Sequence, residues 1–258
     1  MEKCIFYENE LEDEFAGDSI KAKIIDEKYD YQGGLSRKIG RILWYHIIAK
    51  PIAWCYMKIS YGHKVVNKKV LKELKGKAYF LYGNHTNNIA DPLVPTVINY
   101  FRSVYVVVHA NNVSMPILGK ITPSLGALPL PDNMKAMKNF SKAMENIIAK
   151  KNIVTIYPEA HIWPYYTKIR PFKKDSFGYP VMYNVPVVCF TNTYQKRKFR
   201  KKPRMVTYID GPFYPNQNIP KPQSKQLLRD MAYNAMVERS KNNNVKLVEY
   251  IKKESEKS

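Results

Sequence analysis

Residues 78–92 read AYFLYGNHTNNIADP. The apolar run at the start of this stretch predicts a buried strand, and a polar turn follows it. His85 therefore stands just beyond a strand end, with the carboxylate of Asp91 six residues further along. Pro92 disfavours helical dihedrals at Asp91 and itself suits the first turn of a helix. The stretch predicts a strand, a turn that bears a histidine and a carboxylate, and then a helix.

His85 and Asp91 can act together only if the turn folds back, because residues six apart do not share a helix face. If they meet, the carboxylate holds the imidazole in one tautomer and leaves its other nitrogen as a general base. The alternative is a satisfied histidine at a strand end and an ordinary aspartate cap. Short motifs match often by chance, so the pair alone does not decide between the two interpretations.

Other apolar segments extend the pattern along the chain. Strands are predicted at residues 102–109, 152–157, 185–190 and 205–210, helices at 93–100 and 133–150, and one or two helices at 222–254. Strands that alternate with helices predict an α/β fold, with a largely parallel or mixed sheet flanked by helices. The α/β domain is expected to occupy residues 63–258.

Two segments precede this domain. Residues 1–34 form an acidic lead that is expected to be poorly ordered at its start. Residues 35–62 are rich in Ile, Trp and Tyr, and Pro51 is expected to divide them into two helices. Bulky apolar side chains with basic flanks suit helices at a bilayer interface. The alternative is that the pair merely packs on the domain, and hydrophobic periodicity does not separate the two.

Composition excludes several classes of protein. The 258 residues are 45% hydrophobic and 25% charged, as in globular proteins. Three widely spaced cysteines indicate neither a disulfide framework nor a zinc site. The acidic start is unlike a secretory leader, and no apolar run is long enough for an ordinary membrane span. The net charge of +20 attracts phosphates, whether of nucleic acid, anionic lipid or a phosphorylated metabolite.

A second polar segment, residues 157–163 (YPEAHIW), follows the strand predicted at 152–157. It places Glu159 at the carboxyl edge of the sheet, where α/β proteins bind ligands. The basic side chains that come next can hold a phosphate; they are Lys168, Arg170, Lys173 and Lys174. Taken alone, a Pro-Glu turn before a basic loop is more often solvated surface.

Together these segments resemble the glycerophospholipid acyltransferases, the lysophosphatidic acid acyltransferase family. The family's first motif is Asn-His, four residues, then Asp, and its third is Phe-Pro-Glu-Gly-Thr-Arg followed by Phe-Lys-Lys-Gly. The matching positions, in order, are Asn84-His85 with Asp91, a Gly-centred second motif at 125–130, the third at 157–162 with 172–175, and Val-Pro-Val-Val at 185–188. The resemblance covers residues 36–215, including the helical pair, and collinear motifs outweigh any single one.

Three departures from the family pattern stand out. Five residues rather than four separate His85 from Asp91; Asn88 is nearer, but an amide cannot stabilise an imidazolium as a carboxylate does. The second motif lacks its arginine. Ile162 replaces the arginine of the third motif, and Ala160 replaces its glycine. Those arginines are thought to grip the acceptor's phosphate in the family, so either nearby basic residues substitute for them or the acceptor differs.

The resemblance implies a peripheral enzyme on the cytoplasmic face of a membrane. It would move a fatty acyl group from acyl-coenzyme A or acyl carrier protein to a lysophospholipid, most simply 1-acylglycerol-3-phosphate. No metal, cofactor or nucleic acid is expected. His85 and Asp91 would be catalytic, and the expected substrate-binding residues are Asn84, Gly126, Pro158, Glu159, Arg170, Lys173 and Lys174.

Other hypotheses remain open on the sequence. The chain can be an acyltransferase for a different alcohol, a catalytically silent lipid-binding homologue, a thioester hydrolase or a nucleic-acid-binding protein. The basic run at residues 196–204 can dock an acidic carrier protein, bind anionic headgroups, or form a solvated hairpin tip.

Overall fold

The structure is a computed structural model that describes residues 3–15 and 21–253. Its strands are β1 (Lys3–Tyr7), β2 (Lys64–Val66), β3 (Tyr79–Gly83), β4 (Val104–Val108), β5 (Ala127–Pro129), β6 (Ile153–Ile156), β7 (Val187–Arg197), β8 (Arg200–Phe213) and β9 (Val248–Lys252). Its helices are α1 (Leu35–Gly40), the π-helix η1 (Arg41–Ala49), α2 (Lys50–Tyr61), α3 (Lys69–Glu73), α4 (Val94–Ile98), α5 (Asn111–Ser114), α6 (Leu118–Leu125), α7 (Met134–Ala149), the 3-10 helix η2 (Asp175–Phe177), α8 (Gly178–Tyr183) and α9 (Lys221–Ser240).

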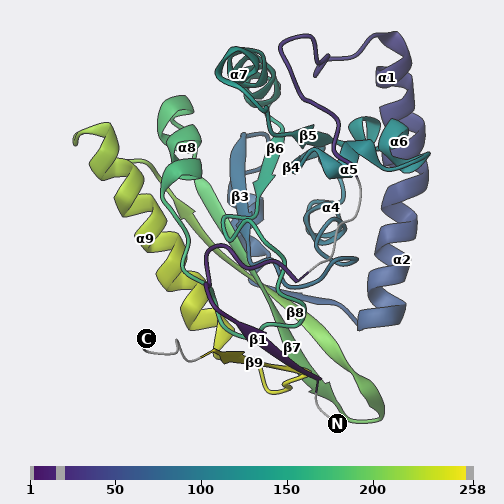
Figure 1. The fold of residues 1–258 in the computed structure, drawn as a ribbon, viewed down its shortest axis with the longest axis vertical. Coiled ribbons are helices and arrows are strands. Elements are labelled where there is room, and N and C mark those ends of the chain that lie inside the picture. The colour runs from purple at the N-terminus through teal and green to yellow at the C-terminus, as the bar shows by residue number, and fades with distance from the viewer. Residues whose placement is uncertain (1–2, 16–20, 254–258) are drawn as a thin grey trace.

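A central sheet organises the molecule. Over the described residues it has seven strands in the order β2-β8-β7-β3-β6-β4-β5, with helices on both faces (Figure 1). Neighbouring strands are parallel except β7 and β8, which form a long antiparallel hairpin. The expected α/β fold with a largely parallel, mixed sheet is confirmed.

The burial of strand β3 on both of its faces explains its continuous run of apolar and aromatic residues. Tyr79 and Leu81 belong to the core on the face covered by α2 and α4. Phe80 and Tyr82 belong to the core on the opposite face, under α7, α8 and α9. A parallel strand in the middle of such a sheet is buried on both faces, so it reads as a continuous hydrophobic run.

The segment from Leu35 to Tyr61 is one unbroken helical rod of α1, η1 and α2 (Figure 1). The expected division into two helices at Pro51 is wrong. Proline lacks an N–H, and its ring crowds the carbonyl four residues earlier. The preceding π-helix is wound more widely, as the bond from the N–H of Lys50 to the carbonyl of Tyr45 shows. This wider turn accommodates Pro51 without breaking the rod.

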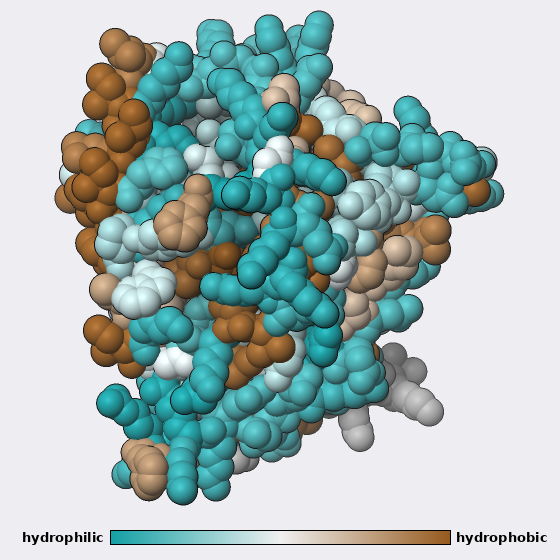
Figure 2. All heavy atoms as spheres, turned by 180° about the vertical axis from the view of Figure 1, so that it is seen from behind, coloured by the Kyte–Doolittle hydropathy of each residue, from teal (hydrophilic) through white to brown (hydrophobic). Residues whose placement is uncertain are grey.

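The rod has two apolar faces. Ala53, Met57 and Tyr61 pack into the core, while the opposite side exposes large apolar residues: Leu35, Ile39, Ile42, Leu43, Trp44, Ile47, Ile52, Trp54 and Ile59. Figure 2 shows hydrophobic side chains gathered along the edge of the molecule where the rod lies. Of the helices that the structure describes, none combines the length and hydropathy needed to span a bilayer.

A small separate sheet joins the two ends of the described chain. Strand β1 runs parallel to β9, with Ile5 opposite Tyr250. The acidic lead was expected to be poorly ordered at its start, but Lys3–Tyr7 form strand β1 there, and residues 1–2 lie outside the described residues. The prediction of helix throughout residues 222–254 is also wrong, because α9 ends at Ser240 and β9 follows. Each strand finds its partner only at the other end of the chain, which local sequence patterns do not reveal.

Candidate active site

The site is built on the carboxyl end of β3. A Cβ at Gly83 would lie 2.0 Å from the ring of Phe190, so glycine is required for the two residues to approach this closely. The buried side chain of Asn84 then ties the strand end to β7. It accepts a hydrogen bond from the N–H of Asn192 at 2.8 Å and donates one to the carbonyl of Asn192 at 3.0 Å. These contacts fix the backbone immediately before His85.

The structure brings His85 and Asp91 together. Nδ1 of His85 lies 2.8 Å from Oδ2 of Asp91. The Asp91 side chain is fully buried, whereas the His85 side chain is 17% exposed. A buried carboxylate on Nδ1 fixes the tautomer and leaves Nε2 as the ring nitrogen free to take a proton from a substrate. This is the arrangement that the sequence predicts if the turn folds back.

Asn87 explains how the turn accommodates its extra residue. The N–H of Asn87 donates to Oδ2 of Asp91 at 2.8 Å, and the N–H of Asp91 donates to the carbonyl of Asn87 at 2.9 Å. Oδ1 of Asn87 also accepts from the N–H groups of Ile89 and Ala90. The turn is thus closed at both ends, and Asn88 is left on the exposed outside. The carboxylate reaches His85 from a bulged loop.

Tyr157, at the end of β6, forms one wall of the site. Its ring stacks on His85 at 4.3 Å between centroids and 19° between planes. Its hydroxyl donates to the backbone carbonyl of Asp91 at 2.5 Å. Burial, together with the charge of Asp91, raises the pKa of Tyr157 well above its ordinary value. The phenol therefore stays neutral, and Tyr157 restrains both members of the pair.

Glu159 supports His85 through the backbone. Oε2 of Glu159 accepts from the N–H of His85 at 3.1 Å, and Oε1 accepts from the N–H of Arg170 at 3.1 Å. Burial raises the pKa of Glu159, while the guanidinium of Arg170 and these N–H groups act in the opposite direction. Both carboxylate oxygens of Glu159 bind backbone N–H groups of the protein. Pro158, which precedes it, is half-buried. The place of Glu159 is that of a positioning residue.

Arg170 is not exposed, as a residue that binds a substrate's phosphate would need to be. Its side chain is fully buried and pairs with Glu159 at 3.4 Å. It also donates to the carbonyls of Glu10 and His161 and lies 4.9 Å from the ring of Trp163. The guanidinium bonds these internal partners, so it holds together the loop at residues 157–175, here called the third-motif loop. Burial lowers the pKa of Arg170, and Glu159 opposes this.

The remaining expected residues do not converge on His85. Lys173 and Lys174 are exposed, just before η2. Gly126 lies toward the amino end of β4, because its neighbour Ala127 pairs with Val106. At Gly126 φ is +104°, and a Cβ would lie 2.6 Å from the carbonyl oxygen of Val104. A tight turn and a close backbone approach both require glycine here, so the role of Gly126 is to shape the fold.

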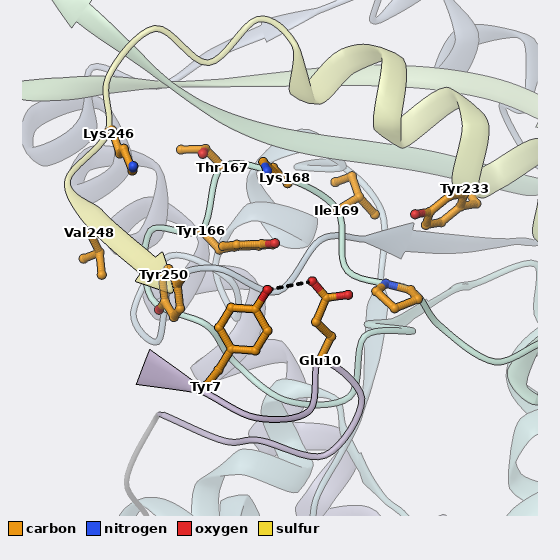
Figure 3. Close-up of a pocket in the computed structure, with 11 residues that line it drawn as sticks. Tyr7, Glu10, Tyr166, Thr167, Lys168, Ile169, Tyr233, Lys246, Val248 and Tyr250 are labelled. Carbon is orange, nitrogen blue, oxygen red and sulfur yellow. Dashed lines mark hydrogen bonds between the residues drawn. The ribbon is translucent and has the colours of Figure 1, made fainter. Parts of the chain in front are cut away.

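A hollow lies beside the loop that follows β6, at residues 157–175. This cleft of about 390 Å³ is lined by residues of β1 and the turn after it, of the loop, and of α9 and β9, among them Tyr7, Glu10, Tyr166, Lys168 and Tyr250 (Figure 3). The hydroxyl of Tyr7 donates to Glu10 at 3.2 Å. Trp163 connects the two regions. Its backbone N–H donates to the carbonyl of His85 at 3.1 Å, and its ring stacks on Tyr250 with 4.9 Å between centroids.

Sequence reasoning did not assign roles to Asn87, Tyr157, Trp163 or Asn192. Asn87 carried a usable signal, because asparagine favours turns in which its side chain bonds the backbone two residues on. The stack of Tyr157 on His85 depends on β6 lying next to β3, which only the strand order reveals. In the described ranges, no group of three His, Cys, Asp or Glu side chains is placed to hold a metal ion.

The fold and this site define a class of protein: an α/β protein with a histidine–carboxylate pair at the carboxyl edge of its sheet. Residues 62–192 match the Acyltransferase family, and the chain belongs to that family. Its fold matches the crystal structure of the 1-acyl-sn-glycerophosphate (LPA) acyltransferase PlsC from Thermotoga maritima with a TM-score of 0.56. The match has 16% identity and covers 77% of this chain and 80% of that one. A comparison with curated proteins gives no match.

Membership of the family supports acyl transfer as the class of reaction. The resemblance inferred from the motifs is therefore confirmed at the level of the family.

Proposed function

We propose that the protein moves a fatty acyl group from an acyl thioester to the hydroxyl of a lysophospholipid in phospholipid synthesis. The first candidate for the acceptor is 1-acylglycerol-3-phosphate. The contact between His85 and Asp91 carries this proposal, since their 2.8 Å separation is kept in spite of the extra residue between them. A turn that only capped a helix would have no need of the closed bulge around Asn87.

The chemistry follows from the pair. An alcohol is a poor nucleophile at neutral pH, so Nε2 of His85 removes its proton as the oxygen attacks the thioester carbonyl carbon. Asp91 stabilises the imidazolium that forms. The tetrahedral intermediate then collapses, the carbon–sulfur bond breaks, and the leaving thiolate takes the proton from His85. The new ester and a free thiol account for all atoms and electrons.

The donor is acyl-coenzyme A or acyl carrier protein, both of which present a thioester. A thiol leaves readily, so the reaction as proposed uses no metal ion and no resident cofactor. Glu159 is not the base in this scheme, because both of its oxygens bind backbone N–H groups.

The residues expected to bind the acceptor's headgroup depart from the family pattern, and a second candidate acceptor follows from this. The third-motif arginine position is Ile162, and the guanidinium of Arg170 is buried against Glu159. Of the basic side chains expected to hold a phosphate, Lys168, Lys173 and Lys174 are exposed and remain accessible. An alcohol with a different headgroup is the alternative acceptor, and the internal pairing of Arg170 favours it.

Membrane attachment is part of the proposal. The rod at residues 35–61 exposes a run of Ile, Leu and Trp side chains that water does not favour (Figure 2). Such a helix lies in a bilayer interface with its apolar side buried. We place the enzyme as a peripheral protein on the cytoplasmic face of a membrane, where lysophospholipids are presented.

The test is acyl transfer from a labelled acyl thioester, with wild type beside His85→Ala. Acceptors are lysophosphatidate, other lysophospholipids, neutral alcohols and water alone. We expect lysophospholipid acylation that falls about 10²–10⁴-fold in the variant, the range for loss of a general base. His109→Ala is the control, since His109 is exposed just beyond β4, which is separated from β3 by β6 in the sheet.

Each other outcome selects a different function. Transfer only to another acceptor would support the second candidate. Free fatty acid without an acceptor would indicate a hydrolase. No His85-dependent product from any acceptor would contradict catalysis and favour the silent lipid-binding homologue. Steeply salt-dependent binding of nucleic acid would support the hypothesis of a nucleic-acid-binding protein.

A further inference from the structure

The long β7–β8 hairpin ends in a surface that the proposed reaction does not use. Residues 196–204 contain seven basic side chains and no acidic one. Strand β7 ends at Arg197 and β8 begins at Arg200, so Lys198 and Phe199 form the turn at the tip. Phe199 is 87% exposed. A bulky aromatic is an unusual choice for a two-residue hairpin turn, which favours Asn, Asp and Gly. We name residues 196–204 the basic tip.

The basic tip is joined to the end of the apolar rod. A guanidinium N–H of Arg197 donates to the carbonyl of Ser60 at 3.2 Å. The ammonium of Lys202 lies 4.4 Å from the centre of the Tyr61 ring. Ile59, one residue before Ser60, is 72% exposed. The apolar face of the rod therefore continues, at its carboxyl end, into the basic tip, and Figure 1 shows the hairpin extending past the end of α2.

We propose that the basic tip is a second membrane-docking element, which binds anionic phospholipid headgroups and inserts Phe199 beside them. A bilayer interface satisfies both halves of this surface, because basic side chains bind its phosphates while an aromatic ring lies among its acyl chains. Nucleic acid would match the charge but offers nothing to the exposed Ile and Leu of the adjoining rod. The inference rests on the membrane attachment proposed above and adds the class of lipid.

Two attachment points have a geometric consequence. A single helix at an interface leaves the protein free to rotate about the helix axis. The basic tip lies beyond the end of the rod and is held to it by Arg197 and Lys202. Contact at both places restricts that rotation, and so fixes which side of the sheet faces the lipid surface.

The experiment measures binding to vesicles of phosphatidylcholine alone and of phosphatidylcholine with phosphatidylglycerol. The tip variant carries Lys198→Gln, Arg200→Gln and Lys201→Gln, which avoids the residues that hold the rod. Each basic residue near an anionic surface is worth about a fivefold change in affinity, so we expect roughly 10²-fold weaker binding to the anionic vesicles. Binding to phosphatidylcholine alone should be unchanged.

A matched control removes the same charge elsewhere. Lys135, Lys138 and Lys142 are exposed on α7, which Figure 1 shows at the opposite end of the molecule from the hairpin. Their replacement by Gln should leave both kinds of binding nearly unchanged. Phe199→Ser tests the inserted ring separately and should weaken binding to both vesicles by about tenfold. Thermal unfolding of each variant checks that the fold is intact.

The outcomes separate this inference from the proposal on which it rests. Absence of wild-type binding to any vesicle would overturn membrane attachment and the inference together. Equal binding to both vesicles by wild type, or an equal loss in the tip and α7 variants, would overturn the role of the basic tip alone. A tip variant that keeps anionic binding but loses transfer from acyl carrier protein would reassign the tip to an acidic protein partner. One that loses only oligonucleotide binding would reassign it to nucleic acid.

Discussion

At Asp91, a single carboxylate has two tasks. Oδ2 accepts both from the His85 ring and from the N–H of Asn87, at 2.8 Å each. The first bond sets the tautomer of the His85 imidazole, and the second closes the turn. A substitution that keeps the shape but removes the charge can separate the electrostatic task from the structural one.

We therefore expect Asp91→Asn to lower acyl transfer by about 10²-fold or more, because an amide does not stabilise the imidazolium. The amide oxygen can still accept from Asn87, so the free energy of unfolding should change by no more than about 1 kcal/mol. Steady-state transfer kinetics and urea unfolding measure the two effects. A large loss of stability with proportionate loss of activity would show that Asp91 serves only the turn.

At the residue scale, the sequence indicates which residues belong to the candidate site but not all of the contacts that they make. The collinear motifs, taken together, indicated that His85 and Asp91 form a pair, which their spacing alone left open. They could not predict that Arg170 turns inward, because a basic residue in a polar loop is usually solvated. The burial of Arg170 depends on Glu159, Trp163 and the carbonyl of Glu10, which come from distant parts of the chain.

The rod at residues 35–61 is the element on which the proposed membrane attachment depends. Trp44 is 41% exposed and Trp54 is 46% exposed, so both rings are available to a bilayer. By contrast, Met57 is fully buried against the domain. One helix thus supports the fold on one side and presents an apolar surface on the other.

Replacing Trp44 and Trp54 with Ser should weaken binding to phosphatidylcholine vesicles by at least about tenfold, since two large apolar side chains lose their contact with lipid. Co-sedimentation with vesicles measures this. Lys72→Ser, which changes an exposed residue of α3, is the control for nonspecific effects. Binding that survives the loss of both tryptophans would favour the hypothesis that the rod only packs on the domain.

Elements with a strong local period were predictable, whereas those decided by tertiary context were not. The helix expected at residues 133–150 is α7, and the buried strands lie where apolar runs predicted them. Pro51 misled because a preceding π-helix changes what proline does to a helix. Strand β9 was missed because residues 248–252 owe their strand to β1, at the other end of the sequence.

Across the whole molecule, one buried histidine makes stability depend on pH. His63 is buried, and Nε2 lies 2.7 Å from the hydroxyl of Thr207. Burial, with Lys58 and Lys68 nearby, lowers the pKa of His63 to about 4. The unfolded chain takes up a proton there near pH 6.5. Between these values the unfolded state holds more protons, so the free energy of unfolding falls as the pH falls.

The full loss attributable to His63 is about 3 kcal/mol, and it is complete below about pH 4. His63→Gln, which retains a polar partner for Thr207, should therefore lose less stability than wild type between about pH 7 and about pH 4.5. Urea unfolding at both pH values gives the difference. Glu159 contributes a slope of its own in both proteins, so the comparison between them isolates His63. Parallel curves would contradict this account.

The pairing of β1 with β9 sets an order in time. Lys3 can pair with Val248 only after Val248 has been synthesised. At ~5–20 residues per second, a ribosome needs on the order of 10–50 s to pass from one to the other. Until then Trp163 lacks the Tyr250 ring that stacks on it, and the third-motif loop lacks its cover. A nascent chain that stalls before this point would keep that loop open to proteases and chaperones. The loop that supports His85 is therefore fully covered only after β9 has been synthesised.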